Sequence, residues 1–343
     1  MRRITVLAGG FGGARFLRGL LAELATRWPD PDIAGTSAAK VTVIGNTGDD
    51  LWIYGLRVCP DLDTIMYTLG HGISAERGWG REDESFRIKD ELAAYGAQPQ
   101  WFGLGDRDIA THIMRTQALN SGYTLSSITQ RLCERWRPGV TLLPMSDDRV
   151  ETHVLVDNPD TGTRTAIHFQ EWWVRHRATL PAHGFIQVGV ETSQPAPGVL
   201  DAIAHADAVI LSPSNPIVSV GTIMGVPGIK QAIRTTPAPV IGISPIIGGA
   251  AVRGMADACL SAMHIETSAA AVGLHYGARR RPDGRDGGGL LDGWLVDTVD
   301  AAAVETLTPT GIKTIARPLL MSDANATRAI ASAAIYLAEE ARR

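Results

Sequence analysis

The first 50 residues constrain the fold most strongly, because a glycine-rich segment separates two short apolar runs. The runs are residues 4–7 and 41–44, and the glycine-rich segment 9–13 follows the first of them. Short apolar runs bounded by glycines are typical of buried parallel strands, and residues 16–24 have an amphipathic helical pattern. This order predicts an α/β fold with a Rossmann-like, doubly wound and mainly parallel sheet, whose ligands bind at the carboxyl ends of the strands.

Two stretches interrupt the expected alternation of strands and helices. Residues 84–136 have a mostly helical pattern, in which Asp106 is expected to cap a helix over residues 107–120. Residues 151–156 and 163–169 are rich in strand-forming residues and are joined by the turn sequence NPDTG. The sequence therefore predicts that a helical and β-hairpin region is inserted into the parallel sheet.

The chain length of 343 residues suits two domains or one large α/β unit. We predict a single unit over residues 1–343, with the Rossmann-like core at 1–70 and 139–260 and an inserted, mostly helical region at 71–138. Residues 279–289, RRRPDGRDGGG, combine charge with proline and glycine. This composition predicts a mobile surface loop, and binding of an anion by its arginines is the alternative interpretation.

Composition excludes several classes of partner. The net charge of -4 indicates no broad basic face, so we expect no nucleic acid partner. The three cysteines are far apart and form no CxxC motif, which argues against a disulfide framework or a thiolate zinc site and favours a reducing compartment. Apolar runs stay well short of the ~18 residues that a membrane span requires, so we expect no membrane association and a cytoplasmic location.

The glycine-rich segment after the first strand predicts an anion site. Backbone N–H groups at the start of a helix bind phosphates, and Gly10, Gly12 and Gly13 would let a phosphate approach. Arg15 adds a planar guanidinium. A tight turn without a ligand is the alternative interpretation. The dinucleotide-binding fingerprint fails, because Arg15 stands where the third glycine is required, which argues against a nicotinamide-dependent oxidoreductase.

Aspartates follow the second expected strand. Asp49 and Asp50 lie in the segment directly after it, and Asp63 comes a short loop later. Converging carboxylates raise one another's pKa values unless a cation is bound, and Mg²⁺ prefers oxygen ligands. The sequence therefore predicts a magnesium site at Asp49, Asp50 and Asp63. Alternatively, Asp49 caps a turn and Asp63 caps a helix that begins near residue 64.

Further polar loops are expected at the same edge of the sheet. Ser212, Ser214 and Asn215 follow the apolar run 208–211, where they could bind a base, a ribose or a phosphate. Asp106 precedes a helix that carries His112, and this histidine can pair with a carboxylate one turn away. Several polar loops at successive strand ends predict an extended ligand.

Together, these motifs resemble those of the 2-phospho-L-lactate transferase family of coenzyme F420 biosynthesis, in particular its actinobacterial phosphoenolpyruvyl transferase branch. The resemblance extends from residue 8 to about residue 255, and the motifs that carry it are GGFGGARFL, GNTGDDLWIYGLRVCPDLDT, GLGDRDIATHI, LPMSDD, IHFQEWWV, SPSNPIVSVG and SPIIGG.

The resemblance implies a reaction. The acceptor would be Fo, an 8-hydroxy-5-deazaflavin, and the donor an enolpyruvyl- or lactyl-diphosphoguanosine. Transfer of the phosphoenolpyruvyl or 2-phospho-L-lactyl group to the ribityl hydroxyl would give dehydro coenzyme F420-0 or F420-0 and release GMP. The resemblance also implies a requirement for Mg²⁺ and a homodimer. The alternative is a non-catalytic nucleotide-sugar-binding regulator of the same fold.

The resemblance also implies residue roles. It associates Asp63 with deazaflavin and metal binding, and it matches Asp49 and Asp50 to metal-side carboxylates. We therefore expect Asp63 and Asp49 to be catalytic, with Asp63 a metal ligand, a general base or both, and Asp63→Asn to abolish turnover while the fold stays intact. The expected substrate-binding residues are Asp63, Gly10, Gly12, Gly13, Arg15, Asp106, His112, Ser212, Ser214 and Asn215. Archaeal members usually carry threonine and lysine at the positions of Gly13 and Arg15.

Overall fold

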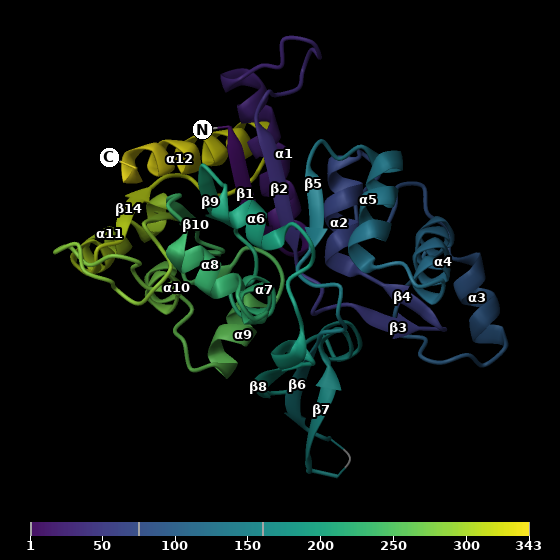
Figure 1. The fold of residues 1–343 in the computed structure, drawn as a ribbon. Helices are drawn as coiled ribbons and strands as arrows, with labels where there is room; N and C mark the ends of the chain where they lie inside the picture. The colour runs from purple at the N-terminus through teal and green to yellow at the C-terminus, as the bar shows by residue number, and fades with distance from the viewer. Residues whose placement is uncertain (1, 75, 160, 343) are drawn as a thin grey trace.

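The computed structural model describes residues 2–74, 76–159 and 161–342, and its centre is a seven-stranded parallel sheet (Figure 1). The strand order is β14-β13-β10-β9-β1-β2-β5, and each neighbouring pair is parallel. The strands are β1 (Arg3–Ala8), β2 (Lys40–Gly45), β5 (Thr141–Pro144), β9 (Ala208–Leu211), β10 (Val240–Ile243), β13 (Gly293–Val296) and β14 (Lys313–Ala316). The predicted Rossmann-like, doubly wound α/β fold is confirmed.

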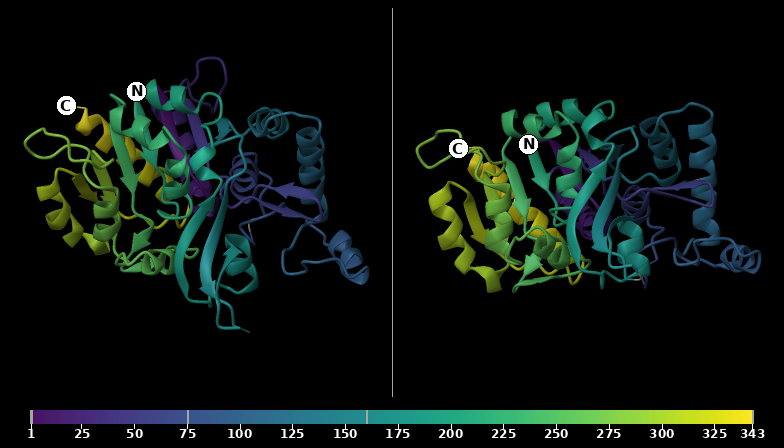
Figure 2. Two further views of the ribbon diagram at one scale, coloured as in Figure 1. Left: turned by 60° about the horizontal axis from the view of Figure 1, so that its bottom comes forward. Right: turned by 90° about the horizontal axis from the view of Figure 1, so that it is seen from below.

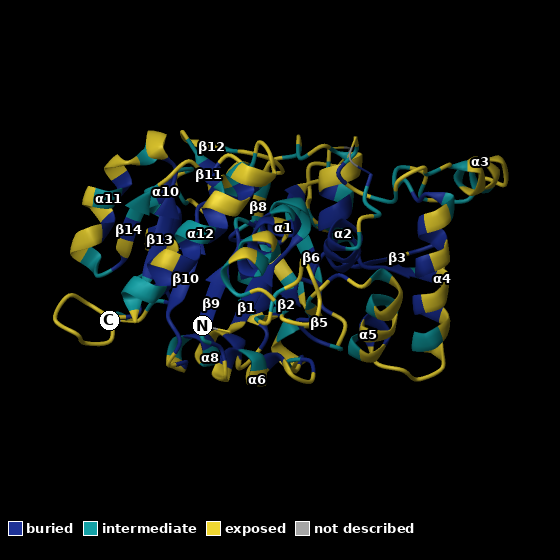
Figure 3. Cartoon of the chain, turned by 90° about the horizontal axis from the view of Figure 1, so that it is seen from above, coloured by how far each residue is buried: buried dark blue, intermediate teal, exposed yellow. Residues whose placement is uncertain are grey.

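Helices cover both faces of this sheet, because consecutive side chains of a strand point to opposite sides. In β1, Val6 and Ala8 join one core cluster, whereas Leu7 joins the other. The first cluster lies under α1 (Gly10–Arg27), α2 (Pro60–Leu69) and α12 (Ala324–Ala341), and the second lies under α6 (Val199–Ala204), α7 (Val220–Gly225), α8 (Ile229–Thr235), α9 (Ala256–Ala262), α10 (Ala269–Tyr276) and α11 (Ala302–Leu307). Figure 3 shows the strands as a buried layer between these helices.

The strand order reverses between β1 and β9, and this reversal opens a crevice. Strand β1 pairs with β2 on one side and with β9 on the other. The connection after β1 runs into α1 on one face, while the chain after β9 turns to the opposite face. Ser212 joins the two strand ends, since its backbone N–H donates to the Leu7 carbonyl at 3.1 Å. A crevice at such a switch point is the usual ligand site of this fold.

The expected insertions lie beside the sheet (Figure 2). They comprise α3 (Arg87–Ala94), α4 (Asp106–Asn120), α5 (Leu125–Trp136), β6 (Glu151–Asp157) and β7 (Arg164–His168), and the structure adds β3 (Leu51–Ile53), β4 (Leu56–Val58) and β8 (Ala182–Val188). The predicted hairpin is confirmed as β6–β7, although residue 160 of its turn lies outside the described residues. Strand β8 adds an unpredicted third strand, and β11 (Ile246–Ile247) and β12 (Ala250–Ala251) form a small hairpin.

Two helix starts differ from those expected. Helix α4 begins at Asp106 itself, and its free N–H groups at Arg107 and Asp108 donate to the carboxylate of Glu84. Asp106 instead accepts from the backbone of Arg87 at the start of α3, so the two loops cap each other's helices. Helix α2 begins at Pro60 rather than near residue 64, because proline suits the first helical turn.

The sheet also extends beyond the predicted core segments, because β13 and β14 follow residue 260. Residues 280–286 are exposed, as expected of a surface loop, but Arg279 is buried. Its guanidinium pairs with Asp292 and donates to the carbonyl oxygens of Thr236 and Ala238, so it anchors the base of the loop. Within the described ranges, no helix has the length and apolarity to cross a membrane.

Candidate active site at the carboxyl ends of the strands

Two adjoining cavities open at the crevice between β1 and β9. The first has a volume of about 260 Å³ and is bordered by the ends of β1, β9 and β10 and by residues 319–321. The second, of about 420 Å³, is bordered by α2, α4 and residues 77–80. Five residues line both cavities, namely Gly10, Phe11, Asp61, Trp173 and Arg253. Molecules bound in the two cavities would therefore meet at these residues.

The glycines belong to the start of α1 rather than to a loop before it, because α1 begins at Gly10. A Cβ at Gly9 would lie 2.6 Å from the Asp61 carboxylate, one at Gly12 would lie 2.5 Å from the Pro213 carbonyl, and one at Gly13 would lie 2.7 Å from the Ser214 hydroxyl. These glycines thus allow α1 to pack closely against protein atoms. Of the three glycines predicted to bind phosphate, Gly10 and Gly12 line the first cavity, whereas Gly13 does not.

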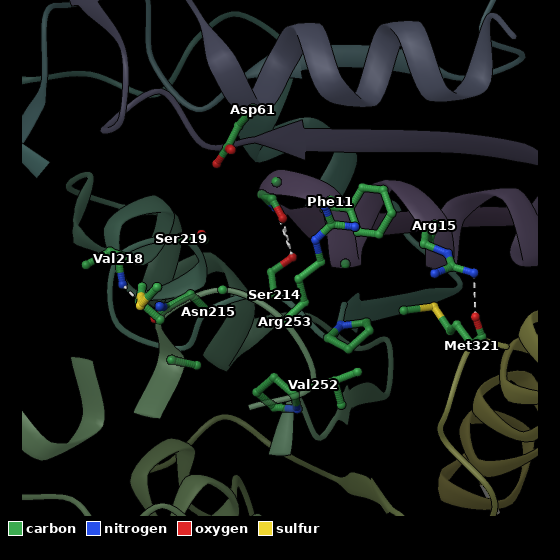
Figure 4. A pocket seen from close by; sticks show the side chains of 18 of the residues that line it. Phe11, Arg15, Asp61, Ser214, Asn215, Val218, Ser219, Val252, Arg253 and Met321 are labelled. Atoms are coloured by element: carbon green, nitrogen blue, oxygen red, sulfur yellow. Dashed lines mark hydrogen bonds between the residues drawn. The ribbon is translucent and has the colours of Figure 1, made fainter. Parts of the chain in front are cut away.

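Arg15 borders the first cavity about one turn further along α1. Its guanidinium donates to the Met321 carbonyl and lies 5.4 Å from the Phe11 ring (Figure 4). Burial lowers the pKa of Arg15, and the neighbouring Arg18 and Arg253 lower it further. Like charges gathered at one cavity wall favour an anionic ligand.

The loop after β9 carries a hydrogen-bonded framework. The Ser214 hydroxyl donates to the Gly9 carbonyl at 2.7 Å and accepts from the Gly9 N–H at 3.1 Å. The side-chain amide oxygen of Asn215 accepts hydrogen bonds from two backbone N–H groups of its own loop. Of the predicted binding residues in this loop, Ser214 and Asn215 line the first cavity. Ser212 is buried and donates to Leu7, so it supports the loop from behind.

Two of the buried aspartates are neutralised by arginines. Asp50 forms an ion pair with Arg57 at 2.9 Å, and Asp63 forms one with Arg115. All four side chains are at most 8% exposed. A guanidinium already provides the charge that a cation would provide, so neither pair fits a metal site well.

The other two aspartates, Asp49 and Asp61, lack such a partner. Both are buried and line the first cavity, and no arginine, lysine or histidine of the described chain forms an ion pair with either. Asp61 accepts from the Asn46 amide at 2.9 Å, whereas Oδ1 of Asp49 is buried without a hydrogen-bond partner. The unpartnered oxygen marks a place where a ligand could bind.

The pKa shifts of these two carboxyl groups support that interpretation. Burial raises the pKa of Asp49 well above its usual range, and the neighbouring Asp61 and Asp50 raise it further. Burial also raises the pKa of Asp61 to about 7. A divalent cation relieves such repulsion, and Mg²⁺ usually takes one or two carboxylates. Asp49 and Asp61 could therefore hold a metal ion.

Asp61 is the residue that the sequence analysis missed. Asp63 of the same PDLD segment was expected to bind metal and deazaflavin because of the family resemblance, with a cap on a helix that begins near residue 64 as the alternative. Because α2 begins at Pro60, Asp61 lies in its first turn and reaches the first cavity, while Asp63 reaches the second. Pro60 was the available signal, since proline favours the first helical position.

The second cavity contains a buried polar network. Nη1 of Arg115 lies 3.2 Å from Nδ1 of His112, and a guanidinium can only donate, so this Nδ1 accepts and the ring proton lies on Nε2. Nε2 in turn lies 3.4 Å from Oδ2 of Asp108. Oδ2 of Asp63 is buried without a hydrogen-bond partner and lies 3.7 Å from His112. It can accept a hydrogen bond from a bound molecule.

Three acidic or imidazole groups in this network, those of Asp63, Asp108 and His112, come close enough to hold a metal ion. The Arg115 guanidinium beside Asp63 and His112 makes this set a poor cation site. We therefore regard the network as a hydrogen-bonding wall. His112, one of the predicted binding residues, lines the second cavity.

Aromatic rings form much of the remaining wall of the second cavity. They are Phe11, Tyr67, Trp79, Phe102 and Trp173. Such rings can stack on a flat heterocycle. Of the two adjacent tryptophans, Trp172 is in the core and Trp173 faces the cavities. Asp106 lies outside both cavity linings and caps α3 at the surface, so the structure does not place it with the other predicted binding residues.

Comparison with known proteins gives the family. A family model described as 2-phospho-L-lactate transferase CofD matches residues 4–318. The chain belongs to this family. It is therefore a transferase enzyme, and the family resemblance predicted from the sequence is confirmed.

Curated relatives match nearly the whole chain. Proteins named phosphoenolpyruvate transferase are 59% identical over 340 residues in Streptomyces griseus, with 99% of each chain covered, and 59% identical over 338 residues in Thermobifida fusca, with 98% covered. Among solved structures, a UPF0052 family protein from Bacillus halodurans has a TM-score of 0.60 at 18% identity, over 98% of this chain and 100% of that one. This likeness shows the fold alone.

Proposed function

We propose that this enzyme transfers a phosphoenolpyruvyl or 2-phospho-L-lactyl group from a guanosine diphosphate-linked donor to the ribityl hydroxyl of Fo, with release of GMP. The product would be dehydro coenzyme F420-0 or F420-0. The observation that carries the proposal is the pair of cavities that meet at Asp61, one with anion-binding features and one with aromatic walls. The names of the curated relatives favour the phosphoenolpyruvyl group.

We assign the donor to the first cavity. It lies at the switch point of the sheet and at the start of α1, where backbone N–H groups favour phosphate. The Asn215 amide and the Arg15 guanidinium provide N–H donors for phosphate, ribose or base, while the Ser214 hydroxyl already donates to the Gly9 carbonyl and holds the loop in place.

We assign Fo to the second cavity. Its volume of about 420 Å³ and its aromatic rings suit a flat deazaflavin with a ribityl chain. The polar network at its inner wall would form hydrogen bonds with the hydroxyl groups of the ribityl chain. Because Asp63 faces this network and Asp61, two residues earlier on α2, lines both cavities, the ribityl terminus would reach the wall shared with the donor cavity.

We propose that Asp49 and Asp61 hold the Mg²⁺ that the family resemblance implies. Their buried, uncompensated carboxylates fit a divalent cation, whereas Asp50 and Asp63 already have arginine partners. The proposed ligand set therefore differs from the sequence-based set, in which Asp50 and Asp63 accompanied Asp49. Bound there, Mg²⁺ would neutralise charge on the donor phosphates.

The remaining chemistry is assigned to this chain's own residues. Oδ2 of Asp63 accepts a hydrogen bond from the acceptor hydroxyl, and Arg115 holds the other oxygen. The hydroxyl oxygen forms a bond to the distal phosphorus of the donor, the bond from that phosphorus to the GMP oxygen breaks, and the hydroxyl proton passes to Asp63. This proposal assigns Asp63 the role of general base rather than that of metal ligand.

The test is product formation. Purified protein is incubated with Fo and each guanylated donor, with and without Mg²⁺, and products are identified by mass spectrometry. We expect a phosphodiester of Fo and stoichiometric GMP only with Mg²⁺ present. If Fo binds but neither donor yields product, the transferase proposal fails and the regulator interpretation is favoured. The homodimer implied by the resemblance is proposed as well, and light scattering tests it.

A further inference from the structure

Arg253 occupies an unusual position between the two cavities. It belongs to the segment between β12 and α9 and lines both cavities. Among the described residues that line both, it is the one cation and Asp61 is the one anion. Any group passed from one cavity to the other therefore passes near its guanidinium.

The guanidinium of Arg253 is held by two contacts. It stacks on the Phe11 ring at 4.0 Å from the ring centroid, and Figure 4 shows it extending toward Phe11. Nη2 also donates to the Arg77 carbonyl at 2.8 Å. A guanidinium has five N–H donors, so this bond leaves most of them for a ligand.

The second contact ties Arg253 to the wall of the acceptor cavity. Residues 77–80, here called the roof strap, line that cavity. Gly78 of the strap has a φ of +72°, and a Cβ on it would lie 2.8 Å from Nη2 of Arg253 and 2.8 Å from the Phe11 ring. The strap therefore approaches Arg253 so closely that only glycine fits at this position.

We propose that Arg253 is a catalytic residue that binds the transferred phosphate and also anchors the roof strap over the bound acceptor. The proposal rests on the proposed function. The reacting phosphorus has to lie where the donor and acceptor cavities share a wall, and phosphoryl transfer depends on neutralising charge there. The planar fork of arginine suits phosphate oxygens better than lysine does.

This arrangement also couples the two substrates. A donor phosphate that fixes the Arg253 guanidinium would fix the Arg77 carbonyl and hence the roof strap. Donor binding would then tighten acceptor binding, and the coupling would be reciprocal. The coupling is measurable without turnover.

The first experiment removes the guanidinium. We expect Arg253→Ala to lower kcat by about 100-fold or more, as loss of one charge-stabilising donor does, while Arg253→Lys recovers part of this loss. Arg253 is exposed, so the variants are expected to fold, and thermal unfolding checks this. A kcat for Arg253→Ala within about threefold of wild type would overturn the phosphate contact.

The second experiment tests the strap with matched glycines. Gly78→Ala would push a methyl group against Arg253 and Phe11, whereas Gly80→Ala has a similar positive φ of +65° but no atom within 4 Å. We expect Gly78→Ala to raise the KM for the acceptor about tenfold more than Gly80→Ala does. Because the added methyl group also meets Arg253, we expect Gly78→Ala to raise the donor KM as well, while Gly80→Ala leaves it unchanged. Equal effects of the two substitutions would overturn the anchoring role.

The third experiment separates this inference from the proposed function. Fo affinity is measured by fluorescence with and without guanosine diphosphate and Mg²⁺. We expect guanosine diphosphate to tighten Fo binding at least fivefold in wild type and to have no effect in Arg253→Ala. Absence of tightening in wild type, or its persistence in the variant, would refute the coupling. Lack of product from both donors would contradict the proposed function alone.

Discussion

Two pairs of buried aspartates from the same two segments have opposite environments. Asp50 and Asp63 each contact an arginine, while Asp49 and Asp61 face the first cavity without one. The difference arises from direction, since Asp61 and Asp63 are two residues apart on one helix and point about 200° apart.

The comparison separates two uses of the same side chain. A buried carboxylate with a matching guanidinium supports the fold, because removal of either partner leaves a buried charge. A buried carboxylate without one destabilises the free protein until a ligand neutralises it. Substitutions in the two pairs should therefore have opposite consequences for stability.

The largest expected effect is that of Asp61→Asn on catalysis. Loss of this proposed metal ligand should lower kcat about 1000-fold or more, because charge on the donor phosphates is no longer neutralised. The same change replaces a buried carboxylate that has no cationic partner with a neutral amide, so the melting temperature should stay equal or rise. Steady-state kinetics and thermal unfolding measure the two quantities.

Glu151→Gln is the matched control for that prediction, because this carboxylate lies outside both cavity linings. It should leave kcat near the wild-type value. An Asp61→Asn variant that retains wild-type turnover, or one that unfolds, would contradict the assignment of Asp61.

The next largest effect is the loss of protein stability when an arginine-paired aspartate is replaced. Asp63→Asn leaves the Arg115 guanidinium buried without a counter-charge and should lower the free energy of unfolding by about 3 kcal/mol. This loss of stability comes in addition to the sequence-based expectation, which was an intact fold without turnover. Urea unfolding measures the change, and Asp63→Asn combined with Arg115→Met should recover much of it. An unchanged midpoint in the single variant would show that the ion pair contributes little.

The stabilisation that Mg²⁺ provides is also expected to differ between variants of the two aspartate pairs. Saturating Mg²⁺ should stabilise the wild-type protein by about 2 to 3 kcal/mol at 100-fold excess over its dissociation constant. The stabilisation should vanish in Asp49→Asn and Asp61→Asn and persist in Asp50→Asn, where the arginine-paired residue is changed. Thermal unfolding with and without the ion measures it. Loss of the effect in Asp50→Asn alone would reverse the proposed assignment.

The sequence predicted the fold well where local patterns act alone. The apolar runs at 4–7, 41–44 and 208–211 became β1, β2 and β9, because short buried strands have continuous apolar sequences. Strand β8 was missed, since AHGFIQV includes glycine and polar residues and forms by pairing with β6. Strand pairing across the chain cannot be read from a single segment.

The site was predicted in outline for a related reason. Polar loops at strand ends predicted where ligands would bind, and four of the residues so predicted, Gly10, Arg15, Ser214 and Asn215, line a cavity there. Which aspartate is free and which is paired depends on arginines that are distant in sequence, such as Arg115, 52 residues from Asp63. Contacts of that kind come from tertiary packing, so the sequence could not distinguish the two roles.

The smallest expected effect comes from a paired carboxylate nearer the surface. Hydrogen bonding to His153, together with Arg149, lowers the pKa of Glu151 to about 2. Since this value lies below that of the unfolded chain, the group stabilises the fold above about pH 4.5 and loses this contribution as the pH falls toward 2. Its size should stay below about 1 kcal/mol, because Arg149 is 63% exposed and solvent screens the pair.

The measurement is the difference in melting temperature between wild type and Glu151→Gln. We expect wild type to be slightly more stable at pH 7 and the difference to shrink at pH 3.5. A difference that is the same at both pH values would show that the Glu151 pair is not linked to folding. A difference as large as that of Asp63→Asn would show that burial does not decide which ion pairs support this fold, and the contrast between the two aspartate pairs would then need another cause.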